Sequence, residues 1–147
     1  MKKTNNKGFS LVELIVVIAI MAVLIGVLAP TFTKYVERGR KSTDVQNVAA
    51  ITTAIQTYAA DPMATASLTN GKVTITTTET AVSTSNATGN ANEALTAAGI
   101  DKIKLSSEKW GATSIEINFT VSTDGSVTFS CGTTLATDHD ILAGKYK

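Results

Sequence analysis

One carboxylate lies inside the most apolar stretch of this chain. Glu13 lies five residues into a run that begins at Phe9, and from Leu14 to Pro30 no residue carries a charge. A carboxylate near hydrocarbon costs on the order of 3 kcal/mol on insertion scales, and such residues usually have a partner. Glu13 could extend from the membrane interface to water, or it could neutralise a positive group in an assembled state. The natural candidate is an α-amino group freed by cleavage between Gly8 and Phe9 on a neighbouring subunit.

Other residues that could do chemistry are sparse. His139, the only histidine, lies between Asp138 and Asp140, and these three could hold a metal ion. Two carboxylates are a thin ligand set, since Ca²⁺ usually takes six to eight oxygens. We therefore expect an exposed polar turn and no metal, with Asp138 and Asp140 as the candidate ligands if a metal binds. Cys131, the only cysteine, cannot form a disulfide within the chain, and we expect a buried thiol rather than a nucleophile.

The remaining composition argues against catalysis and against nucleic-acid binding. Lys109-Trp110 and residues 145–147 each combine an aromatic ring with charge, and each is expected to pack or to be solvated. No phosphate-binding loop, Ser/His/Asp set or paired-cysteine metal site occurs, so we expect no enzyme and no cofactor. Without the first eight residues, which hold three lysines, ten Lys and Arg remain against 12 Asp and Glu, a net charge of −2. A mildly acidic chain is a poor electrostatic match for nucleic acid, and no direct binding is expected.

The segment that positions Glu13 has a basic head and a long apolar run. Phe9 to Phe32 is 24 residues, or about 36 Å as a helix, which is long enough to span a bilayer. The basic head would hold the N-terminus in the cytoplasm. A secretory signal, a membrane anchor and a specialised processing signal all share this order. The run is longer than a usual secretory segment and no small-x-small cleavage site follows it, so the anchor interpretation remains.

Residues 7–14, KGFSLVEL, resemble the processing site of type IV prepilins and type II secretion pseudopilins. That family has a short basic leader ending in Gly, then Phe, three more residues, Glu and an apolar helix. The resemblance implies that a prepilin peptidase cuts between Gly8 and Phe9 and methylates the new amine of Phe9. The family's acid, the fifth residue after the cut, is here Glu13, and many pilins carry a proline at the depth of Pro30. The resemblance covers roughly residues 7–40.

After Pro30 the pattern becomes amphipathic. From Val45 the apolar steps are three and four residues, the spacing of one helical face. The helix should end near Ala60, because Asp61-Pro62 disfavours helical geometry. We expect the apolar face to pack on the C-terminal domain of the same chain; its members are Phe32, Val36, Val45, Val48, Ile51, Ile55, Tyr58 and Ala59. Polar residues are expected to fill much of the remaining surface near the membrane: Lys34, Glu37, Arg38, Arg40, Lys41, Asp44 and Gln46.

Gly26 and Pro30 are expected to disturb this helix. Proline lacks an amide hydrogen and clashes with the preceding turn. We predict a local irregularity between these two residues. It is either a simple kink in an anchor or a stretch that melts or extends when subunits pack into a filament.

The C-terminal part predicts a small antiparallel sheet. Residues 72–78, 114–122 and 125–131 are expected as strands, the last two joined by a hairpin at Thr123-Asp124-Gly125. Residues 93–99 predict a short helix that ends on glycine, and residues 80–92 a surface loop. The predicted fold class is α+β: a long N-terminal helix, with its apolar half protruding, packed on a small antiparallel sheet, as in type IV pilins.

Four segments are therefore expected. They are a basic leader at 1–8 that is cleaved, an apolar transmembrane and assembly helix at 9–33, its amphipathic continuation at 34–60, and a small globular domain at 61–147. The resemblance implies a structural subunit, with Gly8 and Phe9 as the processing site and Phe9, Glu13, Gly26 and Pro30 in assembly. The Thr-rich C-terminal domain favours the major pilin of a surface filament for adhesion or motility.

Alternatives stay open inside and outside this family. One is a pseudopilin of a type II secretion system, whose major pseudopilins carry a calcium site, or of a competence system for DNA uptake. Another is a monomeric membrane-anchored binding module, which would have no use for Glu13. The chain also lacks the cysteine pair that closes the C-terminal loop of many pilins.

The resemblance implies the partners and the location of the protein. The partners are further copies of the chain in a helical filament, a prepilin peptidase, the membrane before assembly, an assembly ATPase and platform proteins. The protein is expected in the cell membrane as a single-pass precursor and then in an extracellular surface filament.

Overall fold

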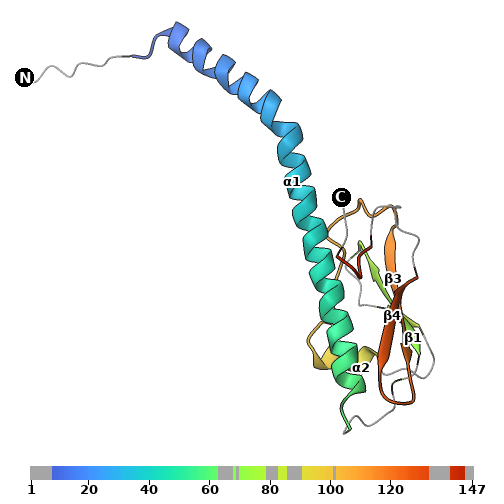
Figure 1. Ribbon diagram of the computed structural model, residues 1–147. Helices are drawn as coiled ribbons and strands as arrows, with labels where there is room; N and C mark the ends of the chain where they lie inside the picture. The colour runs from blue at the N-terminus through green and yellow to red at the C-terminus, as the bar shows by residue number, and fades with distance from the viewer. Residues whose placement is uncertain are drawn as a thin grey trace, which may run out of the picture. The chain divides into compact units, whose positions relative to one another are not determined.

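The computed structural model describes residues 8–62, 68, 70–78, 83–85, 91–100, 102–132 and 140–144. In these residues two helices and four strands follow one another, and Figure 1 shows their arrangement. They are α1 (Leu11–Ala59), β1 (Gly71–Thr76), β2 (Ser83–Ser85), α2 (Ala91–Ala97), β3 (Ser114–Val121) and β4 (Val127–Cys131). The chain forms two compact units, Met1–Val36 and Glu37–Lys147, and α1 belongs to both. The predicted α+β class with an antiparallel sheet is confirmed.

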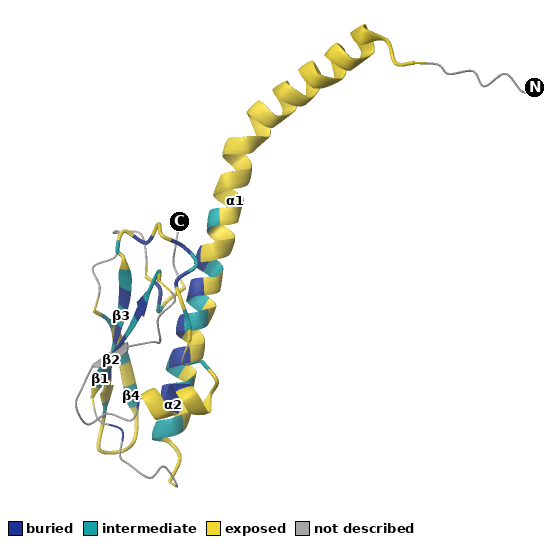
Figure 2. Ribbon diagram, turned by 180° about the vertical axis from the view of Figure 1, so that it is seen from behind, coloured by how far each residue is buried: buried dark blue, intermediate teal, exposed yellow. Residues whose placement is uncertain are grey.

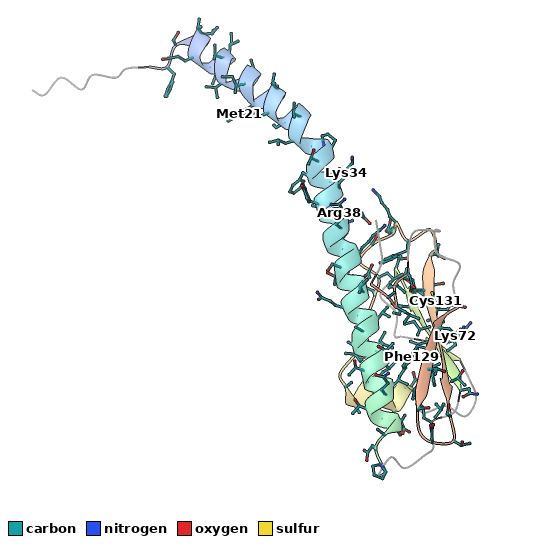
Figure 3. The ribbon with its side chains drawn as sticks, in the orientation of Figure 1. Met21, Lys34, Arg38, Lys72, Phe129 and Cys131 are labelled. Atoms are coloured by element: carbon teal, nitrogen blue, oxygen red, sulfur yellow. The ribbon has the colours of Figure 1, made fainter. Side chains whose placement is uncertain are left out.

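The first unit consists of the apolar part of α1 and the residues before it. Its large apolar side chains are exposed, from 39% for Val36 to 93% for Phe9. Met21 is one of them, and Figure 3 shows it on the surface of the helix. By length and composition α1 is able to cross a membrane. The first unit therefore has no packed interior of its own, and its side chains need lipid or other protein chains around them.

α1 is helical without interruption through Gly26 and Pro30, so the stretch between them is not melted in this structure. A proline ring inside a helix clashes with the carbonyl of the residue four positions earlier. Here that residue is Gly26, which has no side chain and open space where a Cβ would stand. Thr33 Oγ1 donates a hydrogen bond to the Pro30 carbonyl at 3.0 Å in the following turn.

The second unit packs the amphipathic half of α1 against a four-stranded sheet of order β2-β1-β3-β4, with every pair antiparallel. Cross-strand partners such as Val73 and Ile117, or Ile75 and Ile115, are both buried. In Figure 2 the buried residues of α1 lie only in this half, on the side toward the sheet. Val48, Ile51 and Ile55 are each at most 1% exposed in the shared core. The predicted packing of this face on the C-terminal domain is confirmed from Val45 to Ala59, whereas Phe32 and Val36, which were counted in the same face, are exposed.

The predicted strands and turns agree with the structure to within a few residues. β3 buries Ile115, Ile117 and Phe119 on one face, as its alternation predicts. Phe129 and Cys131 of β4 and Lys72 of β1 are labelled in Figure 3. The hairpin between β3 and β4 turns at Gly125, whose φ of +82° suits glycine best. Helix α1 ends at Ala59, one residue before the predicted end.

Residues 80–99 differ from the prediction in one detail and agree with it in another. Part of the predicted loop at residues 80–92 is ordered structure, since β2 pairs with β1 and α2 begins at Ala91. The short Ser-Thr-Ser strand carries no apolar alternation, so the sequence pattern gave no sign of it. The helix predicted at residues 93–99 is confirmed as α2. It is closed by Gly99, with φ of +70°, and by the Ile100 amide, which donates to the Leu95 carbonyl at 2.9 Å.

Candidate processing and assembly site

The Gly8–Phe9 bond lies outside the helix. Gly8, Phe9 and Ser10 precede α1 and are exposed, with Phe9 at 93%. A Cβ added at Gly8 would meet nothing within 4 Å. A peptide bond in a helix is tied into the hydrogen-bond ladder of its neighbours, whereas this bond is free of that ladder. A protease can therefore approach it without unwinding α1.

Glu13 is bonded to its own chain. The Ser10 amide donates a hydrogen bond to Glu13 Oε2 at 2.9 Å. Ser10 occupies the position before the helix and Glu13 its third residue, so the pair has the spacing and the reciprocal bond of a capping box. A carboxylate in the first turn also interacts favourably with the helix dipole. The sequence analysis missed this contact, although the Ser-x-x-Glu spacing is its signal.

The structure brings together only part of the expected site. Gly8, Phe9 and Glu13 lie within the first turn of α1 and the residues before it. Gly26 is 13 residues beyond Glu13 on the same helix, a rise of about 20 Å. Pro30 lies one turn further. These two can affect assembly only through the path of the helix and not through contact with Glu13 in the same chain.

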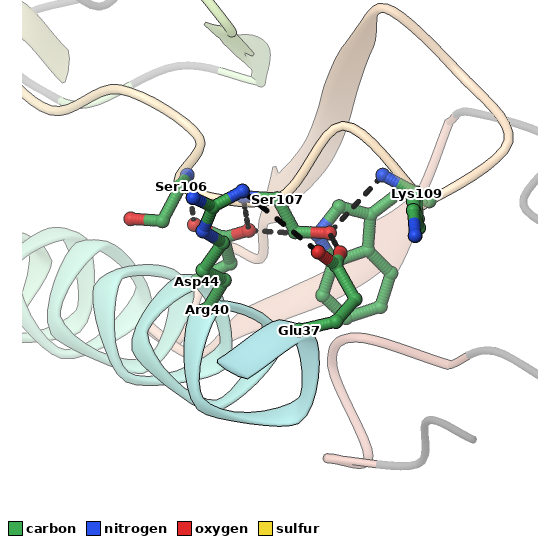
Figure 4. Close-up of polar contacts among 7 residues, drawn as sticks. Glu37, Arg40, Asp44, Ser106, Ser107 and Lys109 are labelled. Atoms are coloured by element: carbon green, nitrogen blue, oxygen red, sulfur yellow. Dashed lines mark hydrogen bonds and ion pairs between the residues drawn. The ribbon is translucent and has the colours of Figure 1, made fainter. Parts of the chain in front are cut away.

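A second set of polar groups, buried in the second unit, was not expected at all. Asp44 is 0% exposed. Its carboxylate accepts hydrogen bonds from the Ser106 amide at 2.6 Å, the Ser107 amide at 3.0 Å and the Trp110 indole nitrogen at 2.8 Å (Figure 4). Three donors on one buried carboxylate replace the water it has lost. Asp44 thereby ties the loop before β3 to α1.

Two neighbours of Asp44 on α1 extend this polar cluster. Glu37 accepts the hydroxyl hydrogen of Ser107 and lies 4.0 Å from Arg40 (Figure 4). The Lys41 ammonium lies 5.4 Å from the centre of the Trp110 ring, a cation–π arrangement. Burial lowers the pKa of Lys41 from its ordinary value, and Glu37 opposes this effect. We name these residues the α1 polar cluster: Glu37, Lys41, Asp44, Ser106, Ser107 and Trp110.

The solvent-facing position predicted for Lys41 and Asp44 is wrong, since they are 4% and 0% exposed. Residues 37, 41, 44, 48, 51 and 55 follow one another at steps of four, three, four, three and four. The buried face of α1 therefore continues past Val48 into polar residues. The spacing of these residues indicates one continuous helical face. Their polarity nevertheless predicts exposure to solvent, because charged side chains are buried only where they have partners.

The remaining candidate residues that the structure describes form no metal site. Asp138 and His139 lie outside the described residues, and Asp140 is exposed and accepts the Ala143 amide at 3.1 Å. Among the described residues, no three His, Cys, Asp or Glu side chains gather where they could hold a metal ion. Cys131 is half-buried rather than buried, against the core. Trp110 is packed inside the protein, as one of the two interpretations of Lys109-Trp110 predicted.

One tyrosine bridges the two helices of the second unit. Tyr58 of α1 donates its hydroxyl hydrogen to Glu93 Oε2 of α2 at 2.8 Å. This bond, followed by desolvation and the nearby negative charges, raises the pKa of Tyr58. A groove of about 600 Å³ beside it is lined by α1, α2 and the residues that follow each helix, mainly by alanine and threonine side chains, with Asp61 as its one carboxylate. The groove has no pairing of acid and base groups that would support catalysis.

This chain is similar to one family profile, at its N-terminal end, and to two known proteins. A profile of the prokaryotic N-terminal methylation motif matches residues 3–29. "Prepilin peptidase-dependent protein A" of Clostridium perfringens (strain 13 / Type A) is 38% identical over 73 residues, which are 50% of this chain and 52% of that protein. "Type IV major pilin protein PilA" of Myxococcus xanthus (strain DK1622) is 35% identical over 54 residues, 37% of this chain and 24% of that protein.

The aligned region thus spans about half of the Clostridium protein and about a quarter of the Myxococcus protein. No solved structure matches this chain significantly. The matched residues of the motif include the exposed Gly8–Phe9 bond, the capped Glu13 and the start of the apolar helix. This chain therefore carries the prokaryotic N-terminal methylation motif and is similar over part of its length to a prepilin peptidase-dependent protein and to a type IV pilin.

Proposed function

We propose that this protein is a structural subunit, the major pilin, of a type IV pilus-like surface filament for adhesion or motility. The observation that carries the proposal is the exposed apolar first part of α1, most of which lies within the methylation motif and which continues into a packed domain. Such a helix is stable in lipid before assembly and among the same helices of other subunits after it. A packed domain whose described residues hold no cluster of metal-ligating side chains suits a structural role.

The proposed sequence of events begins in the membrane. The basic leader stays in the cytoplasm while α1 spans the bilayer. Prepilin peptidase cuts between Gly8 and Phe9 and methylates the new amine of Phe9. Glu13 then pairs with the amine of a neighbouring subunit, which sets the axial register while the apolar helices bundle. An inner-membrane platform and a cytoplasmic ATPase would drive this step.

The first test is the intact mass and N-terminal sequence of the protein recovered from sheared surface material. A chain that starts at methylated Phe9 in that material supports the surface filament. Full-length protein found only in membranes would favour the anchored monomer. Processed protein absent from the sheared fraction would favour the short filament of a secretion or competence pseudopilin.

The role of Glu13 has its own test. Glu13→Ala should be processed and should lower filament yield, because the neighbour's amine loses its counter-charge. A filament of unchanged yield and order would refute the pairing role while leaving the filament proposal intact. Gly26 and Pro30 are proposed to let α1 adjust its path during assembly. Gly26→Leu should therefore lower filament yield more than a leucine at Ala22, one turn earlier on the helix.

A further inference from the structure

We propose that the Ser10 amide is a positioning group for assembly, which holds one oxygen of Glu13 within its own subunit and leaves the other for the amine of a neighbour. This inference rests on the proposed filament function. It adds a partner for Glu13 before assembly and gives a role to the backbone of Ser10. The bond that carries it is Ser10 N to Glu13 Oε2, 2.9 Å long.

The two oxygens of Glu13 differ in this structure. Oε2 accepts the Ser10 amide, whereas Oε1 has no hydrogen-bond partner among the described residues. A carboxylate has about four lone-pair sites, so it can accept from both an amide and an ammonium group. Assembly therefore need not break the capping bond. The neighbour's amine joins a carboxylate that is already oriented.

The capping bond also gives the isolated carboxylate of Glu13 a partner before assembly. Glu13 lies in the first turn of α1. No residue after it carries a charge as far as Thr33. A carboxylate at that depth needs a partner, and a backbone amide of its own first turn supplies one without a second chain. Side chains on a helix tilt toward its N-terminus. The bond therefore holds the carboxylate toward the N-terminal end of α1, on the side of the bond that processing would cut.

The direct test uses the unassembled full-length chain in detergent micelles and needs no cleavage. Hydrogen exchange of the Ser10 amide should be about fivefold slower in the wild type than in Glu13→Ala, the ratio that corresponds to a cap worth about 1 kcal/mol. Equal exchange rates would overturn the inference.

The assembly test separates the amide hydrogen from the charge. Ser10→Pro removes the N–H and keeps Glu13, whereas Ser10→Ala keeps both. Per processed subunit, Ser10→Ala should form filaments as the wild type does, and Ser10→Pro should yield about fivefold fewer. Equal yields from the two variants would refute the positioning role. Should Ser10→Pro also block processing, the exchange measurement on the unprocessed chain decides.

The same experiments separate this inference from the function on which it rests. If the wild-type chain forms no surface filament, the proposed function fails. The slowed Ser10 exchange would then still identify the capping bond as a property of the subunit. If filaments form but Ser10 exchanges equally fast in Glu13→Ala, the function stands and the positioning role fails.

Discussion

Asp44 on α1 accepts the indole N–H of Trp110 at 2.8 Å, and both side chains are fully buried. The two residues are 66 positions apart in the sequence. Because the same carboxylate also binds two backbone amides, this contact fixes a loop and a helix to each other at once. It is the main polar link between α1 and the loop before β3 that the structure describes.

Asp44→Ala should lower the free energy of unfolding by roughly 3 kcal/mol, since it removes the carboxylate that accepts from two buried donors and one half-buried donor. Asp44→Asn, which keeps one oxygen, should lie between this variant and the wild type. The measurement is urea unfolding of the full chain in micelles, followed by the fluorescence of Trp110, the only tryptophan. Glu108→Gln, at an exposed position of the same loop, is the control and should change stability by less than about 0.5 kcal/mol.

Gly8→Leu should block processing and leave the fold unchanged. The position is exposed and a Cβ there meets nothing within 4 Å, so a larger residue costs the folded chain little. Cleavage in the proposed mechanism needs the bond after Gly8 to enter a protease site, which a branched side chain would hinder. Intact mass should show the full-length chain, while circular dichroism matches the wild type. A chain cut at Phe9 in this variant would contradict the proposed role of Gly8.

Tyr58 should ionise above its ordinary pKa of 10.0, because the bond to Glu93 favours the neutral phenol. A group whose pKa is raised in the folded state stabilises it fully below the unfolded pKa. This contribution is lost as pH rises through the folded pKa. Ultraviolet titration of a variant with Tyr35 and Tyr146 changed to Phe isolates Tyr58 among the three tyrosines. Adding Glu93→Gln should lower the midpoint, and an unchanged midpoint would show that the bond is absent in solution.

Gly125→Ala should destabilise the protein by about 1–2 kcal/mol, because φ at this position is +82° and an L-residue with a side chain is strained there. Gly39→Ala is the matched control. Gly39 lies inside α1 with open space around it, so alanine should stabilise the chain by up to about 1 kcal/mol. Both values come from urea unfolding in micelles. If both substitutions lowered the stability, or both raised it, the assignment of backbone strain to Gly125 in the hairpin alone would be contradicted.

The elements that the sequence predicted well are those with a single dominant signal. The stripe of Val48, Ile51 and Ile55 has helical spacing and was found in the core. The β3–β4 hairpin combined alternation with Asp124-Gly125, and the structure supplies the reason. The hydroxyl of Ser126 donates to Asp124 Oδ1 at 2.7 Å and holds the pKa of that carboxyl below its ordinary value. Local residue types were sufficient for these features.

The features that were missed depend on contacts between distant residues. Nothing near Asp44 in the sequence indicates that Ser106, Ser107 and Trp110 will surround it, so a charged residue on a helix was expected to face water. β2 is held by pairing with β1 and by no pattern of its own. Glu13 stands out by its apolar surroundings, whereas its bond to Ser10 depends on the backbone path into the first helical turn. The Ser-x-x-Glu spacing is the local sign of that bond.

In a filament that bears a pulling force, the α1 polar cluster would decide where a subunit yields. In such a filament the pulling force would run along the helices. It would reach the second unit at Glu37 of α1, where the hydrogen bonds of Glu37 and Asp44 begin. Several bonds that share a shearing load must break together, whereas bonds loaded one at a time open in succession. The cluster would therefore take the load before the β-strands do. The sheet and its surface loops could then vary in sequence without weakening the fibre.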